Sequence, residues 1–235
     1  MTVSELQALS AAAGLDLDAY REGHVEKRVT RALERERVTT TAGLVRLVAG
    51  DPSVRDRFRR SIAVSVSGLF RDPEQFDLLE RELLPPLLEG GRRLRVWSAG
   101  CADGSELYSV AILLERLGAL ERAFLLGSDL LEENLAAARR GVYEGAAISE
   151  RLRARVRFQQ RDLVRAGAPP GKWQLILCRN VAIYLAAEAK QRLHRTLASA
   201  LAPGGVLLLG RSERLANPAA LGLERSAPHA YRRSC

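Results

Sequence analysis

From residue 92 onward, short apolar runs alternate with longer segments of helical periodicity, and this alternation limits the fold more than any other feature of the sequence. The apolar runs include "LRVWSA", "AFLLGSD", "WQLILC" and "GGVLLLG", and the segments between them include "ELYSVAILLERLG" and "AAEAKQRLHRTLASALA". Strands buried on both faces have continuous apolar runs, and the helices that cover them have one apolar face. The alternation predicts an α/β fold with a doubly wound, mostly parallel sheet, to which the closing "RSAPHAYRR" is expected to add one last strand.

The first 70 residues carry helical signals instead. Thr2 and Glu5 have the spacing of a capping box, and apolar residues recur at helical spacing in "HVEKRVTRALERER". A further helix is expected to begin at Asp72 as N-cap, with Pro73 in its first position, and to stop or kink at Pro85-Pro86. We therefore predict a small all-helical N-terminal domain over residues 1–70, a linker and connecting helix over 71–91, and the α/β domain over 92–235.

The chain has a formal net charge of +8 at pH 7, which favours an acidic partner: a protein, a nucleic acid or a membrane surface. Much of this charge is arginine interleaved with glutamate, so solvated helix faces are the alternative. The three cysteines and three histidines lie far apart, and neither a disulfide framework nor a metal site is expected. The N-terminus lacks a signal-peptide pattern and no apolar run has the length of a membrane span, so we expect a cytoplasmic protein without membrane insertion.

The loop after the first predicted strand reads "SAGCADGSELYS" and leads directly into a helix. Ligands of doubly wound sheets bind at such loops, where backbone N–H groups meet a helix N-terminus. The spacing of Gly100 and Gly104 matches neither the dinucleotide pattern G-x-G-x-x-G nor a phosphate loop. By itself, the loop is compatible with a tight turn or with a cofactor cradle.

Two aspartates follow the next two predicted strands. Asp129 lies 25 residues beyond Gly104, where nucleotide-binding folds place an acid that accepts hydrogen bonds from ribose hydroxyls. Asp162 is placed to accept from an adenine amino group. The alternatives are a helix N-cap for Asp129 and a surface cap for Asp162. With no phosphate-binding lysine motif, the set favours a nucleoside-bearing cofactor without phosphates.

Several motifs together resemble one known family. They are, in order, "SVSGLFRDPEQF", "RVWSAGCADGSELYSVAILL", "GSDLLEENLAAARRGVY", "LILCRNVAIYL", "LAPGGVLLLGRSE" and the closing "YRR". The chain is similar over nearly its whole length to the CheR family of chemotaxis-receptor (protein-glutamate) O-methyltransferases. The resemblance implies a Rossmann-like class I methyltransferase fold with a seven-stranded sheet, S-adenosyl-L-methionine as cofactor and S-adenosyl-L-homocysteine as product.

The resemblance also implies roles for particular residues. Glu106 and Asp129 are expected to contact the amino-acid and ribose portions of the cofactor, and Arg71 and Tyr184 to lie beside the transferred methyl as catalytic residues. The residues implied to bind the cofactor are Ser65, Ser67, Arg71, Gly100, Gly104, Glu106, Asp129, Asp162, Leu163, Arg179 and Asn180.

The chemistry needs no general base, because the methyl on a sulfonium is already activated and a glutamate with a pKa near ~4.3 is ionised at neutral pH. Arg71 and Tyr184 are therefore expected to position the substrate carboxylate. The alternatives are that Arg71 pairs with Asp72 or Glu74 and that Tyr184 only packs.

The sequence departs from the family in three places. The cradle has Ser105 and Leu107 where the family has glutamate and proline, and the linker ends in Leu69 and Phe70 rather than two phenylalanines. The segment "EGAAISERLRARV" is too short for the three-stranded subdomain that many members insert there, and it is expected to be a charged helical segment. We therefore expect no tether for a receptor's tail peptide.

Three functions follow from these features. The first is formation of glutamyl methyl esters on an acidic, helical, chemoreceptor-like protein that docks on the basic helix Lys27–Arg35. The second is methylation of a small molecule, and the third is a non-catalytic module that binds S-adenosylmethionine or S-adenosylhomocysteine. A nucleic-acid substrate is not expected, because "CRNVAIYL" stands where adenine methyltransferases have Asn/Asp-Pro-Pro-aromatic.

Overall fold

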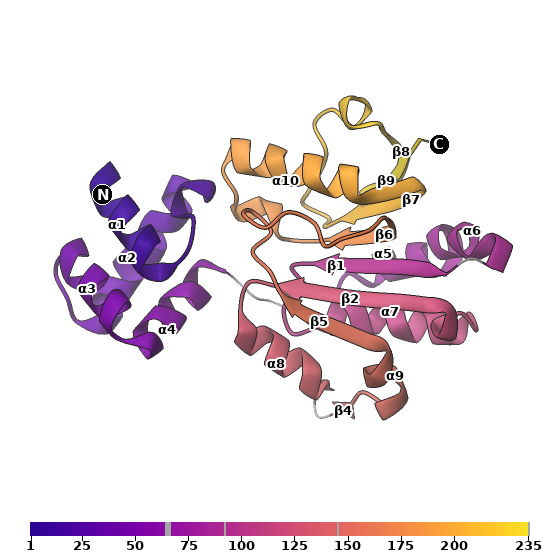
Figure 1. Ribbon diagram of the computed structural model, residues 1–235, viewed down its shortest axis with the longest axis horizontal. Helices are drawn as coiled ribbons and strands as arrows, with labels where there is room; N and C mark the ends of the chain where they lie inside the picture. The colour runs from indigo at the N-terminus through magenta and orange to yellow at the C-terminus, as the bar shows by residue number, and fades with distance from the viewer. Residues whose placement is uncertain (64–66, 92, 145, 235) are drawn as a thin grey trace. The chain divides into compact units, whose positions relative to one another are not determined.

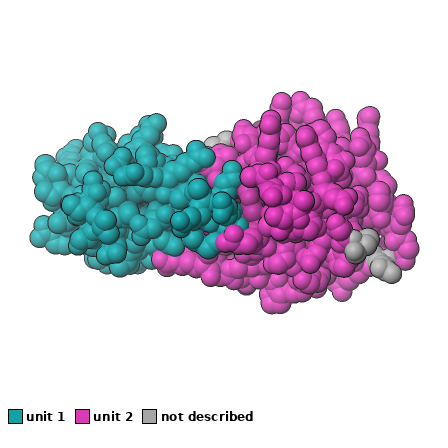
Figure 2. All heavy atoms as spheres, turned by 90° about the horizontal axis from the view of Figure 1, so that it is seen from above, with its two compact units in different colours: residues 1–65, 184–192 teal, residues 66–183, 193–235 magenta. Residues whose placement is uncertain are grey.

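The structure is a computed structural model that describes residues 1–63, 67–91, 93–144 and 146–234 (Figure 1). The chain divides into two units (Figure 2): unit 1 contains Met1–Ser65 and Tyr184–Arg192, and unit 2 contains Val66–Ile183 and Leu193–Cys235. The sequence places residues 184–192 in the α/β domain, whereas the structure groups them with the helices of unit 1. Backbone hydrogen bonds account for this grouping: the N–H of Arg21 donates to the Tyr184 carbonyl (3.0 Å), and that of Ala186 to the Ala19 carbonyl (2.9 Å).

Unit 1 is built on four helices. They are α1 (Val3–Ala13), α2 (Glu22–Glu36), α3 (Thr41–Gly50) and α4 (Pro52–Ile62). The capping box is confirmed, because the Glu5 N–H donates to Thr2 Oγ1 (3.2 Å) and the Thr2 N–H to Glu5 Oε2 (2.7 Å). The buried side chains at the centre of the unit are Leu9, Ala13, Val25, Val29, Leu44, Val48, Phe58 and Ile62.

Unit 2 contains a seven-stranded sheet in the order β5-β2-β1-β6-β7-β9-β8. The first five strands in this order are parallel. β9 runs antiparallel to both of its neighbours, β7 and β8, so β8 has the direction of the first five. The order reverses beside β1 and β6, which is the switch point where ligands of such sheets bind. The predicted α/β fold is confirmed. The strands are β1 (Leu94–Ala99), β2 (Ala123–Asp129), β5 (Val156–Gln160), β6 (Trp173–Cys178), β7 (Leu201–Leu209), β8 (Leu223–Ala227) and β9 (Ala230–Arg233).

The end of the chain forms two strands rather than the single strand expected. β8 and β9 pair with each other across a tight turn at Pro228 and His229, and His229 has a φ of 60°. The Leu209 N–H donates to the His229 carbonyl (2.9 Å), which fixes the turn against β7. The sequence pattern missed the division because one run of nine residues contains both the turn and the strand that follows it.

The helices of unit 2 precede the first strand or connect later ones. Those before β1 are α5 (Pro73–Leu78), the π turn η2 (Leu79–Leu83) and α6 (Leu84–Leu88). Those after it are α7 (Ser105–Arg116), α8 (Glu132–Arg140) and α9 (Glu150–Arg155), while α10 (Ala187–Ala200) crosses from unit 1 into unit 2. The helical run does not stop at Pro85-Pro86. These prolines lie in the first turn of α6, directly after the wider π turn, so their missing N–H groups are accommodated.

The segment after α8 is only partly helical. β3 (Val142–Tyr143) and β4 (Ala146–Ala147) form an antiparallel pair, and the helix α9 begins at Glu150. The expected charged helical segment is therefore correct for its second half and wrong for its first. In the described residues, no helix combines the length and the apolar character that a membrane span requires.

Burial of apolar side chains holds the sheet and its helices together. Leu175 and Leu177 of β6, Leu125 of β2 and Leu114 of α7 are all fully buried in one cluster. The continuous apolar runs of the sequence thus become strands with both faces covered. Trp97 of β1 is also buried, and its indole N–H donates to Ser128 Oγ (2.9 Å).

Replacing Leu175 by alanine should lower the free energy of unfolding by about 2–5 kcal/mol, because the cavity left in this cluster cannot collapse fully. Leu117, which is 37% exposed, offers a matched control whose replacement should cost less than about 0.5 kcal/mol. Urea unfolding of both variants measures the difference. Equal losses would contradict the placement of β6 at the centre of the core.

Candidate functional site

The cradle loop after β1 is held by the end of β2. The N–H groups of Gly100 and Cys101 donate to the Ser128 carbonyl (2.8 and 2.9 Å), and the Ala102 N–H donates to Asp129 Oδ2 (2.9 Å). Gly100 and Gly104 have φ values of 79° and 81°, a region that favours glycine. The loop therefore turns sharply into α7 with its backbone tied to the neighbouring strand.

Neighbouring side chains also require both glycines. A Cβ atom at Gly100 would lie 2.5 Å from Val181 Cγ2, and one at Gly104 would lie 2.8 Å from Ala138 Cβ and Phe158 Cζ. At these distances, the neighbours would have to move. Close approach of the backbone to a cofactor is thus not needed to explain the glycines, although Gly100 does border a cavity.

A buried guanidinium lies at the centre of the site. The Arg179 side chain is 4% exposed and follows directly after β6. Its Nε donates to Gln75 Oε1 (2.8 Å), and its Nη1 donates to Glu106 Oε2 (3.2 Å). Its Nη2 donates to the Arg71 carbonyl (2.6 Å) and to Asp72 Oδ2 (2.8 Å). One side chain thus joins the linker, the start of α5, the first turn of α7 and the end of β6.

The linker that reaches this guanidinium has a strained backbone. Phe70 and Asp72 have φ values of 53° and 59°, which non-glycine residues adopt at a cost of about 1–3 kcal/mol each. The Phe70 N–H donates to Ser109 Oγ (2.8 Å), which anchors the linker to α7. Asp72 occupies the N-cap position of α5, but its side chain makes no capping bond and pairs with Arg179 instead. The predicted start of the helix, with Asp72 as N-cap and Pro73 after it, is therefore confirmed, but the side-chain capping hydrogen bond is absent.

Glu106 is oriented from two sides. Ser98 Oγ donates to its Oε1 (2.6 Å), and Arg179 binds its Oε2. The Glu106 side chain is 14% exposed and lies in the first turn of α7, where the helix dipole stabilises a negative charge. The result is a carboxylate with a fixed direction at the carboxyl end of β1.

A cavity of about 40 Å³ lies among these groups. A larger cavity of about 380 Å³ also borders Ser67 and Gly68, and it extends to Asp103 and Tyr143. The residues that line the smaller cavity are Ser67, Gly68, Arg71, Gly100, Cys101, Ala102, Ser105, Glu106, Arg179 and Asn180.

Asp129 lies at the end of β2, behind the cradle loop, and is 8% exposed. Its Oδ1 accepts from the Leu131 N–H (3.0 Å) and from Asn134 Nδ2 (2.9 Å), in addition to the Ala102 bond to Oδ2. Burial raises the pKa of Asp129 above its ordinary value, despite the hydrogen bonds that favour the ionised form. Leu131, not Asp129, occupies the N-cap position of α8.

Asp162 lies just beyond β5 and caps a turn. Its Oδ1 accepts from the N–H groups of Val164 (2.9 Å) and Arg165 (3.3 Å). This is the surface cap that the sequence offered as the alternative to contact with adenine. One carboxylate oxygen can serve a cap while the other serves a ligand, so the two roles are compatible.

Glu213 was not identified from the sequence, and it is fully buried. It accepts from the N–H groups of Asn180 (2.7 Å), Ala182 (2.8 Å) and Gly210 (2.9 Å). The one signal that points to it is its place in "GRSE", shortly after the last parallel strand, where functional side chains of this fold gather.

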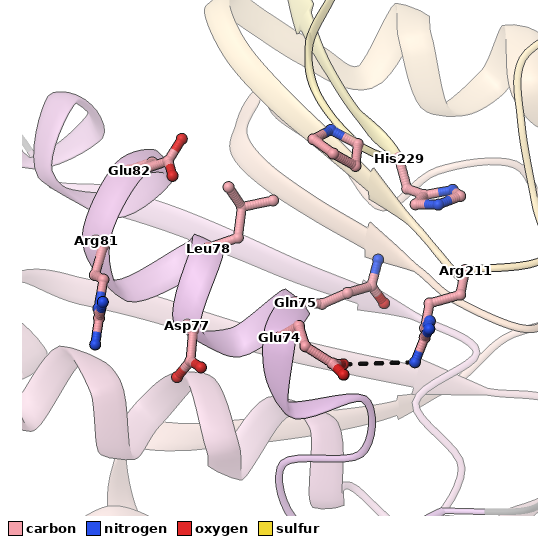
Figure 3. Close-up of a pocket in the computed structure, with 9 residues that line it drawn as sticks. Glu74, Gln75, Asp77, Leu78, Arg81, Glu82, Arg211 and His229 are labelled. Atoms are coloured by element: carbon pink, nitrogen blue, oxygen red, sulfur yellow. Dashed lines mark ion pairs between the residues drawn. The ribbon is translucent and has the colours of Figure 1, made fainter.

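The largest of the three described cavities, of about 580 Å³, lies next to α5 and the π turn (Figure 3). Glu74 and Arg211 form an ion pair at its edge (3.5 Å), with both side chains largely exposed. Gln75 also lines it, and its Nε2 donates to the Leu209 carbonyl (2.8 Å). Because Gln75 also accepts from Arg179, this residue lies between the large cavity and the guanidinium.

Both described cysteines, Cys101 and Cys178, are buried in unit 2. Burial raises the pKa of each thiol well above its ordinary value, so neither is an activated nucleophile. The described part of the chain contains no group of three histidine, cysteine or acidic side chains arranged for a metal ion.

Comparison with known proteins identifies the family. The model of the "CheR methyltransferase, SAM binding domain" matches residues 65–150 and 144–227. The chain belongs to the CheR methyltransferase family. A Listeria innocua protein named "Chemotaxis protein methyltransferase" is 34% identical over 232 residues, which cover 89% of this chain and 88% of the relative. The "Chemotaxis protein methyltransferase 1" of Pseudomonas aeruginosa is 30% identical over 241 residues, which cover 89% of this chain and 88% of the relative.

The geometry brings together about half of the residues that the CheR resemblance implied. Ser67, Arg71, Gly100, Glu106, Arg179 and Asn180 line the small cavity. Gly104, Asp129, Asp162 and Leu163 are not among its lining residues, although Asp129 binds the cradle backbone. Ser65 lies outside the described residues.

Tyr184, the second residue with an implied catalytic role, belongs to unit 1. Its ring lies 5.1 Å from that of His24, which in turn stacks on Tyr20 at 6.1 Å. Packing accounts for these contacts, and a role of Tyr184 in methyl transfer stays a prediction from the sequence. The carboxylates of Asp72 and Glu74, the alternative partners of Arg71, pair with Arg179 and Arg211.

The donor set at the cavity fits part of the cofactor of a CheR methyltransferase, S-adenosylmethionine. Its amino-acid portion carries an ammonium, for which the cavity offers the Glu106 carboxylate as a partner. Asp129, at the end of the neighbouring strand β2, has the position typical of a ribose acceptor in this fold. The small cavity holds only a fragment of such a molecule, so the fit concerns the amino-acid portion.

Replacing Arg179 by lysine should lower the free energy of unfolding by about 1–3 kcal/mol, because an ammonium keeps the charge but loses the planar fork that joins four groups. Arg211→Lys is the matched control: its ion pair with Glu74 is exposed, and its loss should cost about 0–1 kcal/mol. Chemical denaturation compares the two. An unchanged free energy of unfolding in Arg179→Lys would contradict the view that the buried guanidinium holds these four groups together.

Proposed function

We propose that the chain transfers the methyl group of S-adenosylmethionine to a glutamate carboxylate on a chemoreceptor-like protein. The observation that carries the proposal is the cavity at the carboxyl ends of β1 and β6, where the Glu106 carboxylate and the Arg71 and Arg179 side chains meet. Both the amino-acid portion of the cofactor and an incoming carboxylate need charged partners of this kind. The names of the relatives from Listeria innocua and Pseudomonas aeruginosa support the choice of a chemotaxis substrate.

When bound, the cofactor supplies a methyl group on a sulfonium, which is activated and leaves behind a neutral thioether. In the proposed site, the Glu106 carboxylate accepts from the ammonium of its amino-acid portion. Arg179 keeps Glu106 in place, since its own donors are engaged by protein groups. Asp129 accepts from the ribose hydroxyls, and Asp162 with Leu163 borders the adenine.

Arg71 orients the substrate carboxylate in this proposal. A glutamate with a pKa of about 4.3 is already ionised at neutral pH, so alignment and exclusion of water take the place of a general base. The strained linker places Arg71 between two left-handed residues, and the bond from Arg179 to its carbonyl fixes its backbone. A fixed backbone reduces the conformational entropy that is lost when the Arg71 side chain binds a carboxylate.

The partner proposed for unit 1 is an acidic helix of the substrate protein. Lys27, Arg31 and Arg35 are exposed on α2, while the apolar side of that helix, with Val25 and Val29, is buried. Exposed cations on one helix attract an acidic surface over about 8–10 Å at physiological salt. This attraction raises the association rate of the two proteins more than it raises their affinity.

The test is to incubate the protein with methyl-labelled S-adenosylmethionine and cytoplasmic fragments of chemoreceptors. A glutamyl methyl ester gives protein-bound label that alkali releases as methanol. Arg71→Lys should reduce this label at least about tenfold, because a point charge replaces a bidentate donor. Arg225→Lys, an exposed position on β8, is the matched control and should leave the rate unchanged.

The other outcomes discriminate between functions. Alkali-stable label on a small molecule would replace the protein substrate with a metabolite. If the protein binds S-adenosylhomocysteine tightly but methylates none of several types of receptor fragment, it is a binding module. Absence of binding would overturn the cofactor assignment itself.

The affinity for S-adenosylhomocysteine should rise as the pH increases through the pKa of Asp129, which burial holds above its ordinary value near 3.8. Ribose hydroxyls donate more strongly to the ionised carboxylate than to the protonated carboxyl group. Binding therefore lowers this pKa, and the protonated form at lower pH binds less well. Calorimetry over a pH series should show this rise in the wild type and in Asp56→Asn, an exposed control. Asp129→Asn should bind more weakly and lose this part of the pH dependence; an unaltered pH profile in that variant would exclude the ribose contact.

A further inference from the structure

The carboxylate of Glu213 has an unusual environment for an acidic side chain. It is fully buried, and three backbone N–H groups donate to it at 2.7–2.9 Å. Two of the donors, Asn180 and Ala182, belong to the turn after β6, and the third, Gly210, follows β7. We infer that Glu213 is a positioning residue for the cofactor cavity, acting through the turn at residues 179–182; this inference rests on the proposed function.

The turn needs such support because its backbone is strained. Asn180 has a φ of 60°, in the left-handed region. Asn180 lines the small cavity together with Arg179, and the next residue, Val181, packs where a Cβ of Gly100 would be. A shift of this turn would therefore move two cavity residues and the side chain that supports the cradle loop.

Glu213 connects this turn to the neighbouring strand. The Gly210 N–H shares Glu213 Oε2 with the Asn180 N–H, so one oxygen atom joins the ends of β7 and β6. A Cβ at Gly210 would lie 2.8 Å from both Glu213 Oε2 and the Asn180 nitrogen, which leaves room only for glycine. These contacts make the distance between the two strand ends depend on the carboxylate.

The backbone of Glu213 is held from the opposite side. His229 Nδ1 donates to the Glu213 carbonyl (2.9 Å), and His229 and Arg211 border the cavity of about 580 Å³ (Figure 3). The loop that carries Glu213 therefore faces this cavity, while its carboxylate points into the protein. His229 fixes the main chain of Glu213, and the carboxylate of Glu213 binds the turn after β6. The position of this turn therefore depends on where β7 ends.

An ionised carboxylate is the side chain suited to this place, because all of its hydrogen-bonding positions accept. Glutamine has the same shape, but one of its terminal atoms is an NH₂ donor. In one orientation this NH₂ faces the N–H of Ala182, and in the other it faces those of Asn180 and Gly210. Glu213→Gln therefore removes at least one hydrogen bond and places an NH₂ donor against a backbone N–H donor, without changing the side-chain volume.

The experiment measures binding of S-adenosylhomocysteine by calorimetry to the full chain carrying Glu213→Gln, at a temperature well below unfolding. Loss of a bond to a charged group shifts the equilibrium between the native turn and a displaced one by a factor of about 10 to 100. Because only the native turn forms the cavity, we expect the affinity to fall by about tenfold. Glu224→Gln is the matched control: Glu224 is exposed on β8, and its replacement should leave the affinity unchanged.

A merely structural role would lower the unfolding temperature but leave the affinity of the folded molecules intact. The amide proton resonances of Asn180, Ala182 and Gly210 provide a second readout, since an N–H bonded to a carboxylate resonates downfield and should move upfield in Glu213→Gln. Moved resonances with wild-type affinity would overturn the positioning role. If Glu213→Gln does not fold, Gly210→Ala displaces the same atoms with the carboxylate retained, and the same loss of affinity is expected.

The controls separate this inference from the proposed function. A wild-type chain that does not bind S-adenosylhomocysteine overturns the proposed function, and the inference with it. A wild-type chain that binds, beside a Glu213→Gln variant that binds equally well, overturns the inference alone.

Discussion

The buried guanidinium of Arg179 is the interaction on which the rest of the site depends. It forms ion pairs with the carboxylates of Asp72 and Glu106, and it also donates to the Arg71 carbonyl and the Gln75 side chain. These groups come from segments far apart in the chain, and the guanidinium adds to the bonds from Phe70 to Ser109 and from Gln75 to Leu209 that also join them. Burial of so many charges is stable only because each of them has a partner.

Two further carboxylates at the same edge of the sheet hold loops in place by accepting hydrogen bonds from backbone N–H groups. Asp129 binds the backbone of the cradle loop after β1, and Glu213 binds that of the turn after β6. In each case, an acid at the end of one strand accepts N–H groups from the loop of its neighbour. The loops of a parallel sheet need such acceptors because their N–H groups have left the strand ladder and are partly buried.

The sequence was sufficient for the features that depend on local pattern. The limits of β1 and β2 agree with the runs "LRVWSA" and "AFLLGSD", and the capping box at Thr2 is present, because continuous apolar runs and cap spacing are properties of neighbouring residues. Contacts across long separations were not accessible in this way. Arg179 and Asp72 are 107 residues apart, and their ion pair engages the side chain of a residue whose N-cap position the local motif did predict. For the same reason, the role of Glu213 as a partner of Asn180 follows from topology and not from spacing.

The packing of Val181 against Gly100 has a consequence for how such sequences are compared. A glycine in a cradle motif is usually taken as the mark of a bound cofactor, yet here a valine methyl group fills the space that any side chain at Gly100 would need. A descendant of this protein that had abandoned its cofactor would still be obliged to keep that glycine for as long as it kept the fold. Glu106 is constrained in the same way, because its carboxylate partners the buried guanidinium of Arg179. Neither residue by itself therefore shows whether the chemistry has been retained.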